Sequence, residues 1–286
     1  MTETTAAQTH DWEGDAADRW AANLGRLDQM LQVFGDAAIA AAAPRPGERI
    51  LDVGCGQGTT SFALARMVGG DGHVLGVDIS SQLLDHARAD TPDALPVSFL
   101  LADAARADFP PLSFDLIFSR FGVMFFDDPR AAFTHMRRAL SADGRLAFVC
   151  WRSAAENDWV RLPMAAIRDI LPQTPADPNA PGPFAFGDSA RLKAILADSG
   201  FSDIAIAPFD AAIPYGHGTT RDAAIEDALD MAFAVGPLSR ALVDQPNDIK
   251  DLASDAVRAA LAQRPGDTSI LIDGAAWIVT ARNGGG

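Results

Sequence analysis

The stretch Ile50-Leu-Asp-Val-Gly-Cys-Gly-Gln-Gly58 combines a short apolar strand with three closely spaced glycines. The residues that follow, 59–67, carry apolar side chains at helical spacing. A strand that leads through glycines into a helix is typical of the first half of a βαβ unit. Glycine allows positive φ and lets a ligand approach the backbone closely. We therefore expect a ligand-binding turn at the carboxyl end of the first strand of a parallel sheet.

The alternation of strands and helices continues through the middle of the chain. A second strand is expected at 73–78, followed by a helix over 80–89 with Ser80 or Ser81 as its N-cap. This spacing predicts right-handed crossovers and a doubly wound α/β sheet. The further predicted elements are strands at 97–101, 114–119, 145–151 and 204–209, one or two strands over 269–272 and 275–281, and helices at 129–140 and 188–199.

The two flanks of this alternation are expected to add helices to the core. Residues 1–43, with Trp12 and Trp20 at helical spacing, predict an N-terminal helical cap before a core at 44–152. Residues 153–286 are expected to complete the sheet and to carry helical lid insertions at about 153–187 and 215–266, with the Ala-rich stretch 220–263 helical.

The composition excludes several classes of function. The 23 Lys and Arg against 38 Asp and Glu leave a net charge of −15, which opposes binding to nucleic acid or to an anionic membrane. Two cysteines, Cys55 and Cys150, cannot form a disulfide framework or a tetrahedral thiolate zinc site, and no metal is expected. The sequence shows no cationic leader and no apolar run of membrane length, so we expect a cytoplasmic location and no membrane span.

Three acidic residues stand at or near the expected strand ends. Asp52 lies in the first strand, Asp78 ends the second and Asp103 follows the third. Asp78 is placed to accept hydrogen bonds from ribose hydroxyls, and Asp103 from an adenine amino group. A carboxylate next to the glycines repels a pyrophosphate but attracts an ammonium group or a positive sulfur. The spacing of the glycines also departs from the G-x-G-x-x-G pattern of dinucleotide sites.

These motifs, in order, resemble the class I S-adenosylmethionine-dependent methyltransferases. The resemblance rests on the quoted strand and turn, on Gly76-Val-Asp78-Ile-Ser, on Ala102-Asp103-Ala104 and on Phe114-Asp-Leu-Ile-Phe-Ser119. It covers about residues 45–152 and is strongest for the branch that contains the ubiquinone and menaquinone biosynthesis methyltransferases. It implies a Rossmann-like, seven-stranded sheet, mostly parallel with the last strand antiparallel, and S-adenosyl-L-methionine as cofactor.

The resemblance also implies a role for each residue that matches a family motif. Asp52 would hold the amino group of the cofactor through water, Asp78 would bind the ribose hydroxyls, and Ile79 would pack on the adenine. Asp103 would accept from the adenine amino group. The implied cofactor-binding set is Asp52, Gly54, Gly56, Gly58, Asp78, Ile79, Asp103, Ala104 and Ser119.

The segment Arg120-Phe-Gly-Val-Met-Phe-Phe126 is the expected acceptor region, because it follows the fourth strand. An apolar, aromatic lining favours a small hydrophobic or aromatic acceptor. The candidate pocket residues are Arg120, Phe121, Met124 and Trp151. No general base stands out among the five histidines. His217 is a weak candidate, and His10 is a weaker one.

Two other classes of function stay open at this stage. An NAD(P)-dependent oxidoreductase would share the fold, but this sequence lacks the G-x-G-x-x-G pattern of such enzymes. A non-catalytic relative would keep the cofactor site and lose the chemistry. The sequence leaves open the acceptor, the methylated atom (oxygen, nitrogen or carbon) and the oligomeric state.

Overall fold

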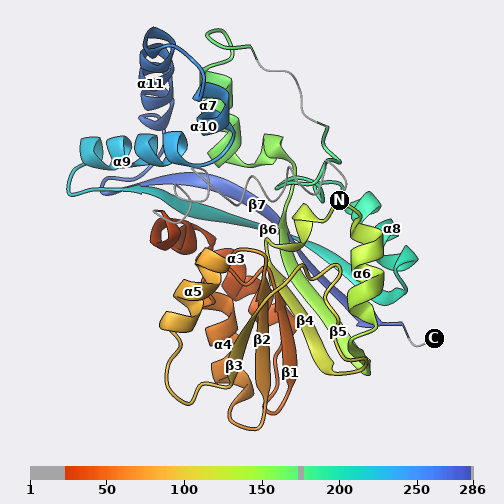
Figure 1. The fold of residues 1–286 in the computed structure, drawn as a ribbon. Coiled ribbons are helices and arrows are strands. Elements are labelled where there is room, and N and C mark those ends of the chain that lie inside the picture. The colour runs from red at the N-terminus through yellow and green to blue at the C-terminus, as the bar shows by residue number, and fades with distance from the viewer. Residues whose placement is uncertain (1–22, 173–176, 285–286) are drawn as a thin grey trace.

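The computed structural model describes residues 23–172 and 177–284. Its centre is a seven-stranded sheet with the strand order β3-β2-β1-β4-β5-β7-β6 (Figure 1). Strands β1 to β5 are parallel, and β7 runs antiparallel between β5 and β6. The predicted α/β sheet with an antiparallel last strand is therefore confirmed. The strands are β1 Arg49–Val53, β2 His73–Asp78, β3 Val97–Leu101, β4 Phe114–Arg120, β5 Leu140–Trp151, β6 Phe201–His217 and β7 Ser269–Asn283.

Helices cover both faces of the sheet, as a doubly wound fold requires. Phe34 of α3 packs edge-on against Trp151 of β5, whereas Phe133 of α6 stacks on Phe148 of the same strand. Because side chains alternate along a strand, Trp151 and Phe148 point to opposite faces, and so α3 and α6 lie on opposite sides. The covering helices are α3 Leu24–Ala42, α4 Thr59–Val68 and α5 Ser81–Ala89 on one side, and α6 Pro129–Arg137 and α8 Ser189–Asp198 on the other.

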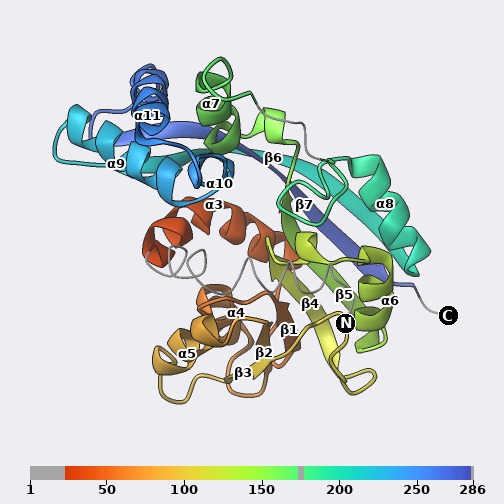
Figure 2. The same ribbon diagram turned by 45° about the horizontal axis from the view of Figure 1, so that its top comes forward.

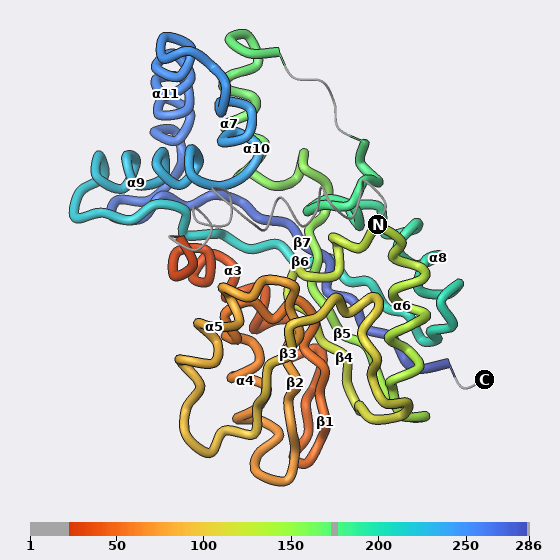
Figure 3. Tube along the Cα trace, viewed as in Figure 1, coloured from red at the N-terminus to blue at the C-terminus, as the bar shows by residue number. Residues whose placement is uncertain are grey.

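Strands β6 and β7 continue as a two-stranded arm beyond the end of β5. Trp151, the last residue of β5, pairs with Ala276, whereas β7 begins seven residues earlier at Ser269, opposite His217. The arm, residues 210–217 and 269–275, therefore extends past the carboxyl edge of the parallel strands, where ligands bind in this fold. Further helices gather on the arm (Figure 3), namely α7 Asp158–Ala166, α9 Arg221–Ala234, α10 Pro237–Leu242 and α11 Asn247–Leu261.

Several predicted boundaries were wrong, and each has a local cause. Strand β6 has 17 residues instead of the predicted 204–209. Of the one or two strands expected at 269–281, the structure shows one, β7, which extends to Asn283. The helix predicted to end at residue 140 ends at Arg137, because Leu140 already pairs in the sheet. The stretch 220–263 forms three helices, separated around Gly236 and Pro246. The short 3-10 helices η1 Val123–Phe125 and η2 Ala154–Glu156 were not predicted as separate elements, whereas helix α7 lies within the helical insertion expected at about 153–187.

Two further points concern the flanks. Within the part predicted as an N-terminal cap, the structure shows helix α3, whereas His10, Trp12 and Trp20 lie outside the described residues. Among the residues described, no helix is long and apolar enough to cross a bilayer.

Candidate functional site

The glycine turn between β1 and α4 is built for close approach. Gly54 and Gly56 have φ of +67° and +55°, in the left-handed region that favours glycine. A Cβ on Gly54 would lie 2.8 Å from the Cα of Gly122, so this turn packs directly on the turn that follows β4. A Cβ on Gly56 would meet no atom nearer than Leu83 Cδ1 at 4.0 Å. The Cα face of Gly56 is therefore open, while the packing of Gly54 on Gly122 fixes the turn.

Gly58 has a different position from the other two glycines. It is buried and precedes helix α4, with Phe99 and Phe62 so close that a Cβ would lie 2.9 and 3.1 Å from their rings. It therefore lets α4 pack on the sheet, which is the third glycine's task in nucleotide-binding turns.

Asp52 is a fully buried carboxyl at the base of the turn. Its Oδ2 accepts hydrogen bonds from the hydroxyls of Thr60, at 2.8 Å, and Ser61, at 2.6 Å. Its Oδ1 is buried and has no partner. Burial raises the pKa of Asp52 to about 6, against the lowering effect of the two hydroxyls and of the Arg120 charge. An unpaired buried oxygen of this kind calls for a donor, and a cationic donor would stabilise its ionised form.

Asp78 ends β2 and ties the glycine turn to the next helix. Its Oδ2 accepts from the Gly56 backbone N–H at 2.8 Å, and its Oδ1 accepts from the Ser80 N–H at 2.9 Å. Burial raises the pKa of Asp78, and these backbone hydrogen bonds oppose the rise. Since each carboxylate oxygen has more than one lone pair, both oxygens can still accept from a ligand.

Asp103, Ile79 and Ala104 continue the same edge of the sheet. The β2–β3 register places Asp78 opposite Leu101, two residues before Asp103. Asp103 Oδ1 accepts from the Ala105 N–H at 2.9 Å, and its Oδ2 lies 3.6 Å from Arg106 Nε. Ile79 is 48% exposed at this edge, whereas Ala104 is buried. The structure therefore brings the predicted acids to the carboxyl ends of the neighbouring strands β1, β2 and β3, the edge where the ligand crevice of this fold lies.

Ser119 and Arg120, at the end of β4, have partners within the protein. The Ser119 hydroxyl donates to the Val53 carbonyl at 2.7 Å and accepts from the Gly122 N–H at 3.1 Å, so it joins β4 to β1. Arg120 Nη2 donates to Asp28 Oδ1 at 2.6 Å, which connects the end of β4 to helix α3. Ser119 is fully buried.

The predicted acceptor residues lie in an aromatic cluster at the carboxyl ends of β4 and β5. Phe121 stacks on Trp151 with ring centroids 4.2 Å apart, and Phe34 of α3 packs edge-on against both rings. Phe121 has φ of +59°, a conformation that costs free energy in a bulky residue and that clusters at functional sites. Met124 is fully buried, and its sulfur accepts from the Trp151 N–H at 3.4 Å.

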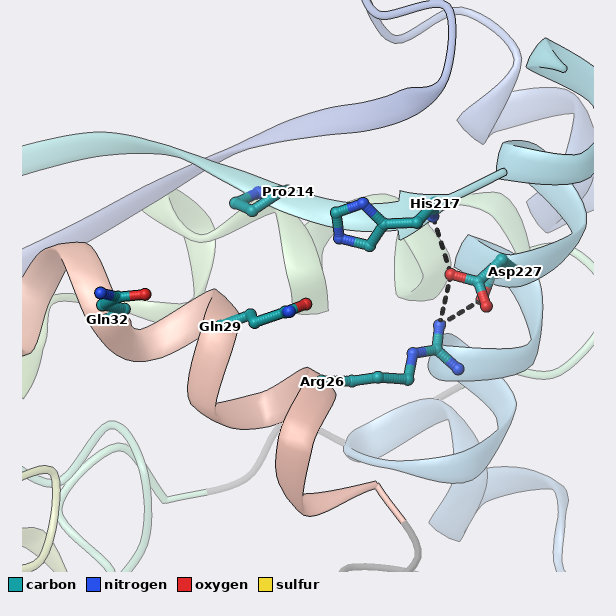
Figure 4. Close-up of a pocket in the computed structure, with 6 residues that line it drawn as sticks. All are labelled: Arg26, Gln29, Gln32, Pro214, His217 and Asp227. Carbon is teal, nitrogen blue, oxygen red and sulfur yellow. Dashed lines mark hydrogen bonds and ion pairs between the residues drawn. The ribbon is translucent and has the colours of Figure 1, made fainter. Parts of the chain in front are cut away.

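His217 lies apart from this cluster, at the end of β6. It lines a pocket of about 570 Å³ together with residues of α3 and α9 (Figure 4). Its backbone N–H donates to Asp227 Oδ2 at 2.8 Å. Across residues 23–172 and 177–284, no group of three His, Cys, Asp or Glu side chains is arranged to hold a metal ion.

Some residues of the site were missed by sequence reasoning. Thr60 and Ser61 carry hydroxyl groups shortly after the glycines, at the start of the helix. Their sequence spacing from Asp52, eight and nine residues, could have indicated that they donate hydrogen bonds to its carboxylate. Asp28 and Phe34 meet their partners across more than 80 residues of sequence, and no local pattern shows this.

Comparison with known proteins assigns the central part of the sequence to a protein family. Residues 50–144 match the model of a methyltransferase domain family. Residues 50–144 therefore form a methyltransferase domain of the class I S-adenosylmethionine-dependent type. S-adenosylmethionine is the methyl donor of this methyltransferase family. The resemblance found in the motifs is thus confirmed for the family.

The curated relatives that match this chain are named for different small molecules. Aklanonic acid methyltransferase DauC of Streptomyces sp. (strain C5) is 32% identical over 136 residues, which cover 46% of this chain and 62% of that protein. The demethylmenaquinone methyltransferase of Clavibacter sepedonicus is 36% identical over 126 residues, which cover 42% of this chain and 50% of that protein. The matches thus span about half to three fifths of these relatives, and menaquinone methyltransferases are among several kinds that match.

The fold has solved counterparts as well. The YcgJ protein of Bacillus subtilis superposes with a TM-score of 0.57 at 19% sequence identity, over 88% of this chain and 98% of that one. This similarity concerns the fold alone.

Proposed function

We propose that this protein transfers the methyl group of S-adenosylmethionine to a small acceptor with an aromatic or mostly apolar ring. The observation that carries the proposal is the buried Asp52 carboxyl with one unpaired oxygen, directly below a glycine turn whose Gly56 face is open. A buried acid with one oxygen that lacks a donor fits a ligand with an ammonium group. It does not fit the pyrophosphate of a dinucleotide.

The residues of the crevice divide the binding of the donor between them. Asp52 would hold the amino group, and Gly54 and Gly56 would lie along the methionine part. Asp78 would accept from the ribose hydroxyls through lone pairs that the Gly56 and Ser80 N–H groups leave free. The exposed side chain of Ile79 would cover one adenine face, and Asp103 would accept from the adenine amino group.

In methyl transfer the main task of the protein is to align the reacting atoms. The donor supplies an electrophilic methyl group, which an acceptor atom attacks in line as the methyl–sulfur bond breaks. Alignment and exclusion of water can supply a large part of the rate acceleration. The packing of the Gly54 turn on Gly122 links donor and acceptor sides rigidly, since a Cβ on either glycine would meet the other's Cα within 2.9 Å.

A general base is needed only for an acceptor whose proton has a high pKa. Two histidines are engaged elsewhere, because His73 is hydrogen-bonded to Ser98 and His135 to the Ala107 carbonyl. An acceptor with an acidic hydroxyl or an activated carbon suits a site of this kind.

The aromatic cluster supports the proposed aromatic or mostly apolar acceptor. Phe34, Phe121 and Trp151 lie next to the turn after β4, where the acceptor should sit, and flat rings pack well on such side chains. The names of the two relatives, which refer to aklanonic acid and demethylmenaquinone, support a small-molecule acceptor.

The experiment is a transfer assay with S-adenosylmethionine labelled in its methyl group and a panel of phenols, hydroxyquinones and aromatic carboxylic acids. We expect label in an organic-extractable product with wild type, and a large loss with Asp78→Ala. Donor binding without transfer to any member would favour the non-catalytic relative. Binding of NADH instead of the donor would favour the oxidoreductase.

A further inference from the structure

The pocket beside the outer half of the arm shares no lining residue with the glycine turn. We call it the arm pocket and define it by Arg26, Gln29, Gln32, Pro214, His217 and Asp227. Its volume of about 570 Å³ lies in the range of small-molecule sites. One wall is the N-terminal half of α3, and the other is the end of β6 with helix α9 (Figure 4).

The two charged residues of the arm pocket neutralise each other. Arg26 Nη2 donates to Asp227 Oδ2 at 2.9 Å and to the Asp227 carbonyl at 2.6 Å. The same Oδ2 also accepts from the His217 N–H. Both side chains of the pair are about one-third exposed, so the pair lies at the surface of the pocket. The lining therefore offers no uncompensated charge to a ligand.

The polar groups left over are two amides and an imidazole, and they point into the pocket. Gln29 and Gln32 are exposed on α3, and the His217 ring projects from β6 toward Gln29 (Figure 4). Within the described part of the chain, no hydrogen bond engages these three side chains. Two amides and one imidazole offer donors and acceptors together, which is the set that pairs with hydroxyl and carbonyl groups. Pro214 adds an apolar ring face beside them.

We infer that the arm pocket binds a neutral small molecule that carries hydroxyl or carbonyl groups on a ring. An anion would be opposed by the net charge of −15 of the whole protein and would find Arg26 already paired. A cation would find Asp227 already occupied by two donors. A neutral ring with oxygens can use the Gln29 and Gln32 amides and lie against Pro214.

Helix α3 connects the arm pocket to the crevice. Arg26 reaches the arm through Asp227, and two residues later Asp28 holds Arg120 at the end of β4. A ligand between α3 and β6 would therefore stabilise the helix that positions Arg120. Two sources share this chemistry, namely the oxygen-bearing part of the acceptor itself or a separate effector, and the first of them rests on the proposed function.

The test measures binding directly and needs no methyl transfer. Protein labelled with ¹³C in its histidine rings and ¹⁵N in its glutamine amides is titrated with catechol and methyl β-D-glucopyranoside as neutral probes. Benzoate and benzylammonium serve as charged probes. His217→Gln identifies the His217 signal. Gln29→Ala/Gln32→Ala is the test variant, and Gln263→Ala, at an exposed glutamine beyond α11, is its matched control.

We expect a saturable shift of the His217 signal with at least one neutral probe and none with the charged probes. The half-saturating concentration should rise about tenfold in the double variant, the effect of two lost hydrogen bonds, and stay unchanged in Gln263→Ala. Absence of a saturable shift with both neutral probes, an equal response to benzoate, or an unaltered double variant would overturn the inference.

Two further arms distinguish the sources. If the pocket holds part of the acceptor, the neutral probe competes with the acceptor, and the double variant raises the acceptor KM without changing the Kd for S-adenosylmethionine. If it holds an effector, the probe changes turnover without competition. A failure of the proposed function would appear separately, as absence of methyl transfer in protein that still binds the probe.

Discussion

Asp52 makes the affinity for S-adenosylmethionine depend on pH in a predictable way. Burial raises its pKa to about 6, and only the ionised carboxylate attracts the ammonium group of the ligand. The ionised fraction is about 0.9 near pH 7 and about 0.1 near pH 5 for a group with this pKa. The Kd should therefore increase about tenfold between these two pH values, which is about 1.4 kcal/mol of binding free energy.

The assay is isothermal titration calorimetry of wild type and of Asp52→Asn at both pH values. The amide cannot ionise, so the variant should bind roughly 10- to 100-fold more weakly near pH 7, the cost of a lost hydrogen bond to a charged group. It should also lose most of the pH dependence. Asp85→Asn, at an exposed carboxylate on α5 that pairs with Arg88, is the control and should behave as wild type. A wild-type Kd that is equal at both pH values, or an Asp52→Asn variant with unchanged affinity, would refute the reasoning.

The remaining predictions concern the turns that hold the site. Asp78→Ala should weaken S-adenosylmethionine binding by about 1.5–3 kcal/mol in a calorimetric titration, because hydrogen bonds to a charged acceptor are lost; unchanged affinity in folded protein would remove its assigned role. Phe121→Ala should lower the free energy of unfolding, measured in urea, by about 3 kcal/mol. It should also reduce acceptor turnover while the affinity for S-adenosylmethionine stays unchanged. Equal losses of acceptor turnover and of this affinity would mean that the loop is only structural. Gly54→Ala should destabilise the fold by more than the roughly 1–2 kcal/mol that an alanine in the left-handed region costs, because its Cβ would meet the Gly122 backbone. Gly47→Ala, with φ of +82° and open space around the Cβ, should cost only that amount. Equal unfolding midpoints of the two variants in urea would contradict this.

The core of the fold was readable from sequence because its signals are local. The strand, the glycines and the helix from Ile50 onward follow each other without interruption, and each element has the period of its own geometry. The acids at the ends of β2 and β3 lie at fixed distances from these elements. Their convergence on one edge follows from parallel pairing alone.

The arm could not be predicted because its strands are stabilised by pairing with each other, and their sequences lack the alternation of apolar and polar residues that indicates a strand. Strand β6 contains Pro208 and Pro214 and several exposed polar residues, so its sequence lacks a regular alternation. Proline is tolerated there because β6 is the edge strand of the sheet. The arm pocket arises from α3 meeting this strand, about 190 residues later in sequence, so His217 gave only a hint of it.

The most direct test of the central claim is a parallel calorimetric titration of the purified protein with S-adenosylmethionine, S-adenosylhomocysteine and NADH. The account predicts micromolar binding of both adenosyl ligands and none of NADH, since Asp52, Asp78 and Asp103 favour a cationic nucleoside over a pyrophosphate. Binding of NADH without either adenosyl ligand would contradict the assignment of these acids and, with it, the proposed methyl transfer.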